Sequence, residues 1–222
     1  MITLLRIGAL TVGSDGYRGE VRAAVIDPVA ATVTHVVVEP EGRSGLARLV
    51  PLGLVDTDTE TDAGTHPGTD AGAASGQLRL RCTQTEFMNL DPAEETLAEF
   101  AVGQTVPVQL LPAGWRGTGE PVAEGGDILR IPERETVDVV PPGQVEEHGG
   151  DHVHATDGAI GQLRGFRLAP ASGRVTHVLL GEGHLWGRKE VAIPFDKITG
   201  FDQGITLSLS KKQVQDLPEI KA

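Results

Sequence analysis

Two stretches of the chain repeat each other, and this duplication constrains the fold more than any other feature of the sequence. The two copies share an ungapped register at an offset of 142 residues, in which Asp15-Gly16-x-x-Gly19 matches Asp157-Gly158-x-x-Gly161 and Val33-Thr34-His35-Val36 matches Val175-Thr176-His177-Val178. Beyond an extra segment in the first copy, the register resumes at an offset of 127, where Leu78, Leu80 and Cys82 match Ile205, Leu207 and Leu209. The shared order of turn, strand and terminal segment indicates a tandem duplication.

Each copy has the pattern of a small β-structure. Asp-Gly between extended runs is typical of a tight hairpin, because glycine supplies the positive φ that the turn needs. The β-branched and aliphatic runs at 33–38 and 175–180 predict strands, and residues 78–82 and 205–209 alternate apolar and polar side chains as half-buried strands do. Both copies then close on a capping box, Thr83-x-x-Glu86 and Ser210-x-x-Gln213, which predicts a short helix that plugs a small barrel.

The sequence therefore predicts an all-β fold with short helices, in which two tandem small β-barrels are joined by an irregular connector. The predicted boundaries are residues 1–90 for the first barrel, 91–152 for the connector and 153–222 for the second barrel. Within the connector, Asp91-Pro92-x-Glu94 predicts a capped helix start and 106–111 a strand. Residues 56–75 are acidic and carry no large apolar side chain, so we expect a disordered insertion in the first barrel.

Charge and composition exclude several classes of function. The chain has 19 basic and 31 acidic residues and a net charge of −12, which disfavours direct binding to nucleic acid or to an anionic membrane surface. Its single cysteine, Cys82, excludes an intramolecular disulfide and a cysteine-based zinc site. Its longest apolar stretches are far below the roughly 20 residues that cross a bilayer, so we expect a cytoplasmic protein without a membrane span.

Residues 153–218 resemble the PRC-barrel family at most of the positions that punctuate its motif. The resemblance rests on Asp157-Gly158-x-x-Gly161, on Gly173-Arg174-Val175-Thr176-His177-Val178-Leu179-Leu180, and on the run from Gly183-His184-Leu185-Trp186-Gly187-Arg188 to Pro194. The first copy is similar to a diverged member, since it has Ala31-Thr32 in place of Gly173-Arg174 and lacks the His-Leu-Trp-Gly-Arg element.

The resemblance implies a function in assembly rather than in catalysis. Members of the family serve as interaction barrels in the cytoplasmic part of photosynthetic reaction-centre H subunits and at the C-terminus of RimM-type ribosome maturation factors. The family has no known catalytic residues, so the resemblance implies neither an enzymatic activity nor a cofactor. We therefore expect a non-enzymatic interaction module with an unidentified protein partner, and self-association into a homo-oligomer is compatible with this interpretation.

A cluster of potential metal ligands lies at the end of the connector and keeps a second class of function open. The cluster comprises Glu146, Glu147, His148, Asp151, His152 and His154. On a strand, His152-x-His154 would place both imidazoles on one face, as a zinc or nickel site needs, and His148, His152 and His154 are the candidate metal ligands. A solvated acidic linker is the simpler interpretation, because Gly149-Gly150 interrupts the cluster.

Two further sets of residues are candidates for a functional role. His35 and His177 are kept by the duplication, and without a neighbouring nucleophile they are interpreted as structural residues. The predicted partner surface is the turn that carries Leu185, Trp186 and Arg188, because tryptophan is enriched where interfaces concentrate their binding energy. A ribosome maturation factor remains an alternative function, and so does a metal-binding protein.

Overall fold

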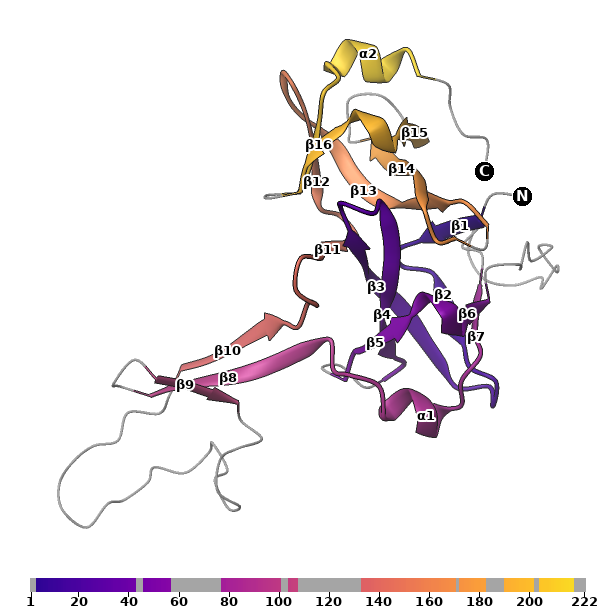
Figure 1. The fold of residues 1–222 in the computed structure, drawn as a ribbon, viewed down its shortest axis with the longest axis vertical. Coiled ribbons are helices and arrows are strands. Elements are labelled where there is room, and N and C mark those ends of the chain that lie inside the picture. The colour runs from indigo at the N-terminus through magenta and orange to yellow at the C-terminus, as the bar shows by residue number, and fades with distance from the viewer. Residues whose placement is uncertain are drawn as a thin grey trace.

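The computed structural model describes residues 3–42, 46–56, 77–100, 104–107, 133–170, 172–182, 190–201 and 204–217. In this part of the chain the protein has the predicted all-β fold, with two short helices. Two seven-stranded sheets form the body of the molecule, and a three-stranded sheet projects from it (Figure 1).

The sheet built mainly from the first copy is called the N-lobe. Its strand order is β5-β4-β3-β2-β7-β6, with β11 paired to β3 outside this path. The strands are β2 (Leu10–Val12), β3 (Arg18–Asp27), β4 (Thr32–Pro40), β5 (Arg48–Pro51), β6 (Val55–Asp56), β7 (Leu78–Leu80) and β11 (Val145–His148).

The C-lobe repeats this topology strand for strand. Its order is β15-β14-β13-β12-β17-β16, with β1 paired to β13 outside the path. The strands are β1 (Thr3–Arg6), β12 (His152–Ala155), β13 (Gly158–Leu168), β14 (Val175–Glu182), β15 (Glu190–Pro194), β16 (Ile198–Gly200) and β17 (Ile205–Leu207). A 3-10 turn follows β5 at Leu52–Leu54 and β15 at Phe195–Lys197. The duplication in the sequence is therefore a duplication of the fold.

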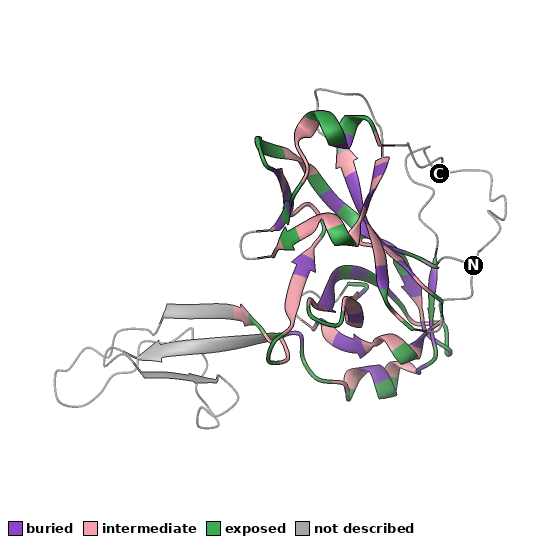
Figure 2. Ribbon diagram, turned by 45° about the horizontal axis from the view of Figure 1, so that its top comes forward, coloured by how far each residue is buried: buried purple, intermediate pink, exposed green. Residues whose placement is uncertain are grey.

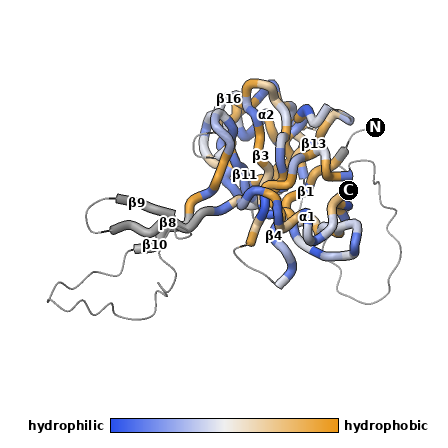
Figure 3. The backbone as a smooth tube through the Cα atoms, turned by 60° about the horizontal axis from the view of Figure 1, so that its bottom comes forward, coloured by the Kyte–Doolittle hydropathy of each residue, from blue (hydrophilic) through white to orange (hydrophobic). Residues whose placement is uncertain are grey.

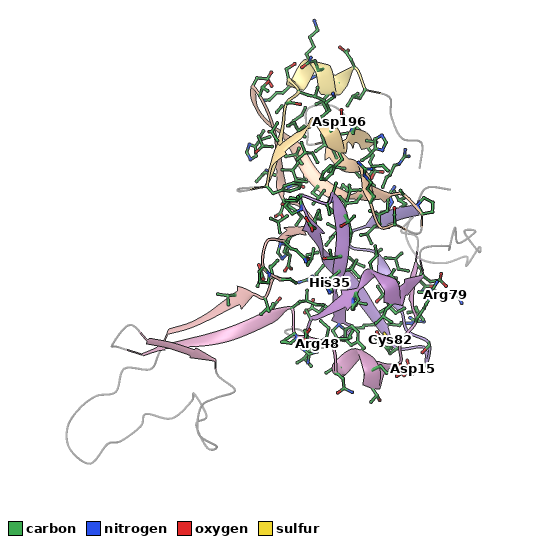
Figure 4. All side chains as sticks on the ribbon, in the orientation of Figure 1. Asp15, His35, Arg48, Arg79, Cys82 and Asp196 are labelled. Carbon is green, nitrogen blue, oxygen red and sulfur yellow. The ribbon has the colours of Figure 1, made fainter. Side chains whose placement is uncertain are left out.

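Both lobes close on the predicted capped helix. Helix α1 (Gln84–Met88) and helix α2 (Lys211–Gln215) each have a complete capping box. The Asp-Gly hairpin is joined to the helix start in each lobe: Asp15 accepts a hydrogen bond from the Gln84 backbone N–H at 2.9 Å, and Asp157 accepts one from Lys211 at 2.8 Å. Figure 4 shows Asp15 beside α1. Each helix contributes one buried residue to the core, Phe87 in α1 and Val214 in α2.

The two lobes exchange one strand with each other. β1, from the start of the chain, pairs with β13 of the C-lobe, and β11, from the end of the connector, pairs with β3 of the N-lobe. The predicted boundaries had assigned 3–6 to the first barrel and 145–148 to the connector. In each copy the chain crosses between lobes at a glycine with positive φ, Gly8 at +87° and Gly150 at +95°. These glycines match at the offset of 142, so the crossing is duplicated as well.

The hairpin tips of the two lobes also bond to each other. The backbone N–H of Val33 donates to the Gly173 carbonyl at 3.0 Å, and that of Val175 donates to the Ala31 carbonyl at 2.8 Å. The two bonds are equivalent under the duplication. The lobes therefore form a two-fold-like pair within one chain.

One hydrophobic core runs through both lobes. It includes Val21, Val36 and Phe87 of the N-lobe and Phe166 and Ile193 of the C-lobe, all of them 1% exposed or less. Figure 2 shows buried residues along the strands of both lobes, and Figure 3 shows hydrophobic positions along the same strands. A smaller outer cluster covers the other face of the N-lobe sheet; it comprises Ala23, Val25, Val37, Ala47, Leu49 and Ala93, with Val140 packed against it.

The connector contains an antiparallel sheet, here called the arm, where the sequence predicted irregular chain. Its order is β10-β8-β9, from β8 (Glu94–Phe100), β9 (Gln104–Pro107) and β10 (Glu133–Asp138). The predicted helix start at Asp91 is wrong. The Asp91 carbonyl accepts from Leu49 N–H at 2.9 Å, and Ala93 N–H donates to the Ala47 carbonyl at 3.0 Å, so tertiary bonds hold this segment extended. The predicted strand at 106–111 overlaps only the end of β9, and residues 108–111 lie outside the described part.

Two predictions concern residues outside this part of the chain. They are the disordered insertion, of which only Asp56 is described, and the partner surface at Leu185, Trp186 and Arg188. Neither described helix has the length and hydrophobicity needed to cross a membrane.

Candidate functional site at the base of the arm

The strand β11 presents two ligand-type side chains on the outer face of the N-lobe. Its antiparallel register pairs Glu146 with Val25 and His148 with Ala23. Directly paired residues point to the same face of a sheet, and Val25 and Ala23 belong to the outer cluster. Glu146 and His148 therefore lie beside the base of the arm, whereas Glu147 between them points toward the main core.

The base of the arm brings a third ligand-type residue to this face. Between β10 and β11 the chain reverses at 141–144, where Gln144 N–H donates to the Pro141 carbonyl at 3.1 Å. Pro142 and Gly143, which has a φ of +79°, occupy the positions that a type II turn favours for proline and glycine. The reversal returns Asp138, the last residue of β10, to the outer end of β11.

Asp138, Glu146 and His148 form one cluster. Each offers a ligand atom that lies within 4.8 Å of the other two. Oε1 of Glu146 is 3.3 Å from Nε2 of His148. The Glu146 side chain is only 5% exposed, and its Oε2 has no hydrogen-bond partner among the described residues. The cluster thus contains a buried carboxylate oxygen that nothing in this part of the protein satisfies.

Two neighbouring carboxyl groups shape the electrostatics of the cluster. Asp151 lies on the other side of the His148 ring, with Oδ2 at 3.9 Å from Nδ1, and the same oxygen accepts a hydrogen bond from the His148 backbone N–H. The carboxylate of Glu146 holds the pKa of His148 above its usual value. On the opposite face, burial raises the pKa of Glu147 to about 8.

The remaining candidate ligands are separated from this cluster. His152 and His154 lie on β12 of the C-lobe, with ring centroids 6.2 Å apart. Neither belongs to the three-residue cluster found among the described residues. The sequence placed Glu146 in the wider group of potential ligands and named His148, His152 and His154 as the candidates, so it included two members of this cluster but missed Asp138. The signal that could have found Asp138 was the Pro141-Pro142-Gly143 turn, because a chain reversal there brings the acidic end of the preceding strand back beside residues 146–148.

His35 and His177 occupy equivalent structural positions. Nδ1 of His35 is 3.0 Å from the Thr34 hydroxyl, and Nδ1 of His177 is 3.1 Å from the Thr176 hydroxyl. Figure 4 shows His35 within the N-lobe. Burial lowers the pKa of both imidazoles, which favours their neutral form.

The arm itself presents open sheet edges. β9 and β10 each pair only with β8 within the described residues, so each carries one row of backbone groups without a partner strand there. Such edges accept a strand from another chain by β-augmentation.

No protein-family model matches the chain, and no curated protein matches it either. The resemblance to the PRC-barrel family stays a prediction that rests on the motifs quoted above.

Proposed function

We propose that the protein is a non-enzymatic assembly module whose two-lobed body presents the arm to a protein partner. The observation that carries this proposal is the arm itself: a three-stranded sheet that stands away from the lobes and has, among the described strands, an unpaired edge on each side (Figure 1). The function implied by the PRC-barrel resemblance, an assembly barrel, supports the same role.

The body is suited to hold such an arm in a fixed direction. Strand exchange and the bonds between hairpin tips tie the lobes together, and the base of the arm packs into the outer cluster through Ala93 and Val140. A rigid support lowers the entropy that is lost when the arm binds.

The charge of the arm segment indicates the chemistry of its partner. Residues 94–138 contain nine acidic and three basic residues, a net charge of −6, which is half of the chain's −12. A protein that offers both an extended strand and a basic surface would complement this segment. The association should therefore be fast at low ionic strength and should weaken as salt is added.

An arm-truncated variant tests the proposal. Glu95 of β8 pairs with Val137 of β10, so joining these two residues through Asn-Gly removes most of the arm and leaves its base in place. We expect the full-length protein, used as bait in its native cell extract, to retain a basic protein in fixed stoichiometry and the truncated variant to lose it. The purified pair should then reproduce the difference in a binary titration.

Two further baits make the result specific. Leu10→Ala, at a 56%-exposed position on β2, serves as a surface control that should leave the capture unchanged. Trp186→Ala addresses the turn that the sequence predicted as the partner surface. If the truncated bait keeps its partner while Trp186→Ala loses it, the arm proposal is wrong and the contact lies at that turn.

A further inference from the structure

We propose that Asp138, Glu146 and His148 bind one divalent transition-metal ion of the zinc type at the base of the arm. The inference does not depend on whether the arm has a partner. It rests on four observations: the spacing of the ligand atoms, the unsatisfied buried oxygen of Glu146, the position of Asp151, and a comparison with the other lobe.

The spacing of the two best-placed ligand atoms fits coordination better than hydrogen bonding. Ligand atoms bound tetrahedrally at about 2.1 Å from zinc lie about 3.4 Å apart. Oε1 of Glu146 and Nε2 of His148 are 3.3 Å apart, which is longer than the usual 2.7–3.2 Å range of an N–H···O bond. The Asp138 carboxylate, from an exposed residue within 4.8 Å of both, can close the site by a side-chain rotation.

The burial of Glu146 leaves a negative site that a cation would satisfy. Its side chain is 5% exposed, and Oε2 lacks a hydrogen-bond partner among the described residues. A buried carboxylate oxygen without a partner is costly, and metal coordination is one way in which proteins satisfy it.

Asp151 is placed as an outer-sphere partner of the histidine. Its Oδ2 lies 3.9 Å from Nδ1 of His148, on the side of the ring away from Glu146. A carboxylate at this position favours the tautomer that carries its proton on Nδ1. That tautomer leaves the lone pair of Nε2 directed toward Glu146. The 3.9 Å separation is longer than a hydrogen bond, so a small rotation of the Asp151 side chain would complete a carboxylate–histidine–zinc arrangement.

The C-lobe shows that the barrel fold does not need these residues. At the offset of 142, Leu4 replaces Glu146 and Arg6 replaces His148 on the exchanged strand. Arg6 forms a bidentate ion pair with Glu190, at 2.9 and 2.8 Å, and Leu4 is 37% exposed. The Glu146–His148 pair is therefore specific to the lobe that carries the arm.

The donor set selects the class of ion. One imidazole and two carboxylates neutralise a divalent charge, and imidazole favours zinc and its first-row neighbours over magnesium and calcium. Three protein ligands leave one tetrahedral position for water.

Calorimetric titration of the untagged, metal-stripped, full-length protein with ZnCl2 tests the site. We expect one zinc ion per chain, and we expect His148→Gln and Asp138→Asn each to weaken binding at least tenfold. Co2+ should give the visible absorption of a low-symmetry site, which the same substitutions remove. The matched control is the double variant His152→Gln/His154→Gln, which should bind zinc as the wild type does.

A second variant set separates loss of ligands from loss of fold. The double substitution Glu146→Leu/His148→Arg transplants the residues that the C-lobe carries at these positions, so it should keep a cooperative melting transition and bind no zinc. The inference is overturned if this variant or His148→Gln binds zinc like the wild type, or if only the His152/His154 control loses binding.

Discussion

The buried carboxyl of Glu147 stands where the other lobe carries a hydrocarbon. At the offset of 142 its counterpart is Leu5, and the two residues are 2% and 1% exposed. Glu147 pairs with Ala24 and Leu5 with Phe166, on the core-facing side of each sheet. Oε2 of Glu147 has no hydrogen-bond partner in the described structure, and burial raises its pKa to about 8, so the carboxyl is mostly protonated at neutral pH.

Replacing this carboxyl should stabilise the protein. We expect Glu147→Leu to raise the free energy of unfolding by about 1–3 kcal/mol, because it removes an unsatisfied buried polar group and places the residue of the twin lobe there. Urea unfolding at pH 7 with EDTA measures the change. Glu147→Gln, which keeps a buried polar group, should give little of this gain. A Glu147→Leu variant less stable than wild type would show that the carboxyl makes a favourable interaction.

At the scale of the element, the Thr-His pairs of β4 and β14 tie each strand to its neighbour. The Thr176 hydroxyl donates to the Arg167 carbonyl at 3.0 Å. The Thr34 hydroxyl lies 3.3 Å from the equivalent Val25 carbonyl and is in closer contact with the side-chain amide of Gln144. Each hydroxyl can then accept from Nδ1–H of the following histidine. The duplication preserves a strand-to-strand contact, which is a structural reason for keeping both histidines.

These histidines should make stability depend on pH. Burial lowers the pKa of His35 and His177 in the folded state below the usual value near 6.5, so the unfolded chain binds protons first as the pH falls. Their contribution is complete above pH 6.5 and is lost as the pH falls toward the folded pKa. Urea midpoints between pH 7.5 and pH 5 should therefore fall more steeply for the wild type than for His35→Gln/His177→Gln. Parallel slopes would contradict this assignment.

At the scale of the whole molecule, the exchanged strands make each lobe depend on the other. β1 completes the sheet of the C-lobe and continues directly into β2 of the N-lobe. In the same way, β11 completes the sheet of the N-lobe and continues directly into β12 of the C-lobe. The main core accordingly contains residues of both lobes. We expect the two lobes to unfold as one cooperative unit.

A substitution in one exchanged strand tests this coupling. Leu5→Ala should cost about 2–5 kcal/mol, as truncations of buried leucines do. Native-state hydrogen exchange should then show lower protection in β2–β7 as well as in β12–β17. The exposed control Leu10→Ala should change neither lobe. A loss of protection confined to the C-lobe would show that the lobes are independent domains.

Local patterns in the sequence were sufficient to predict much of this fold. The Asp-Gly hairpins, the strands around His35 and His177, and both capping boxes depend on neighbouring residues, and all of them form as expected. The sequence also placed Glu146 and His148 in a group of potential ligands, but it applied the shared-face argument to His152 and His154, which lie on β12 of the C-lobe. The sequence did not predict the arm. Asp91-Pro92 at its start has the local pattern of a helix N-terminus, and only hydrogen bonds to the distant residues Ala47 and Leu49 hold this segment extended.

The sequence by itself thus determined the duplication, the all-β class and the turns, since these follow from short-range sterics and hydrogen bonds. Only the tertiary structure decided which lobe each exchanged strand joins. The register of β1 on β13 equals that of β11 on β3, so the backbone pairing pattern is the same with or without exchange. Whether each strand stays with its own lobe or crosses to the other depends on the backbone conformation at Gly8 and Gly150. Both have positive φ here, and glycine can adopt other conformations as readily. The cluster of Asp138, Glu146 and His148 depends on the same long-range choice, because Asp138 meets the other two residues only when β11 lies on the N-lobe beneath the arm.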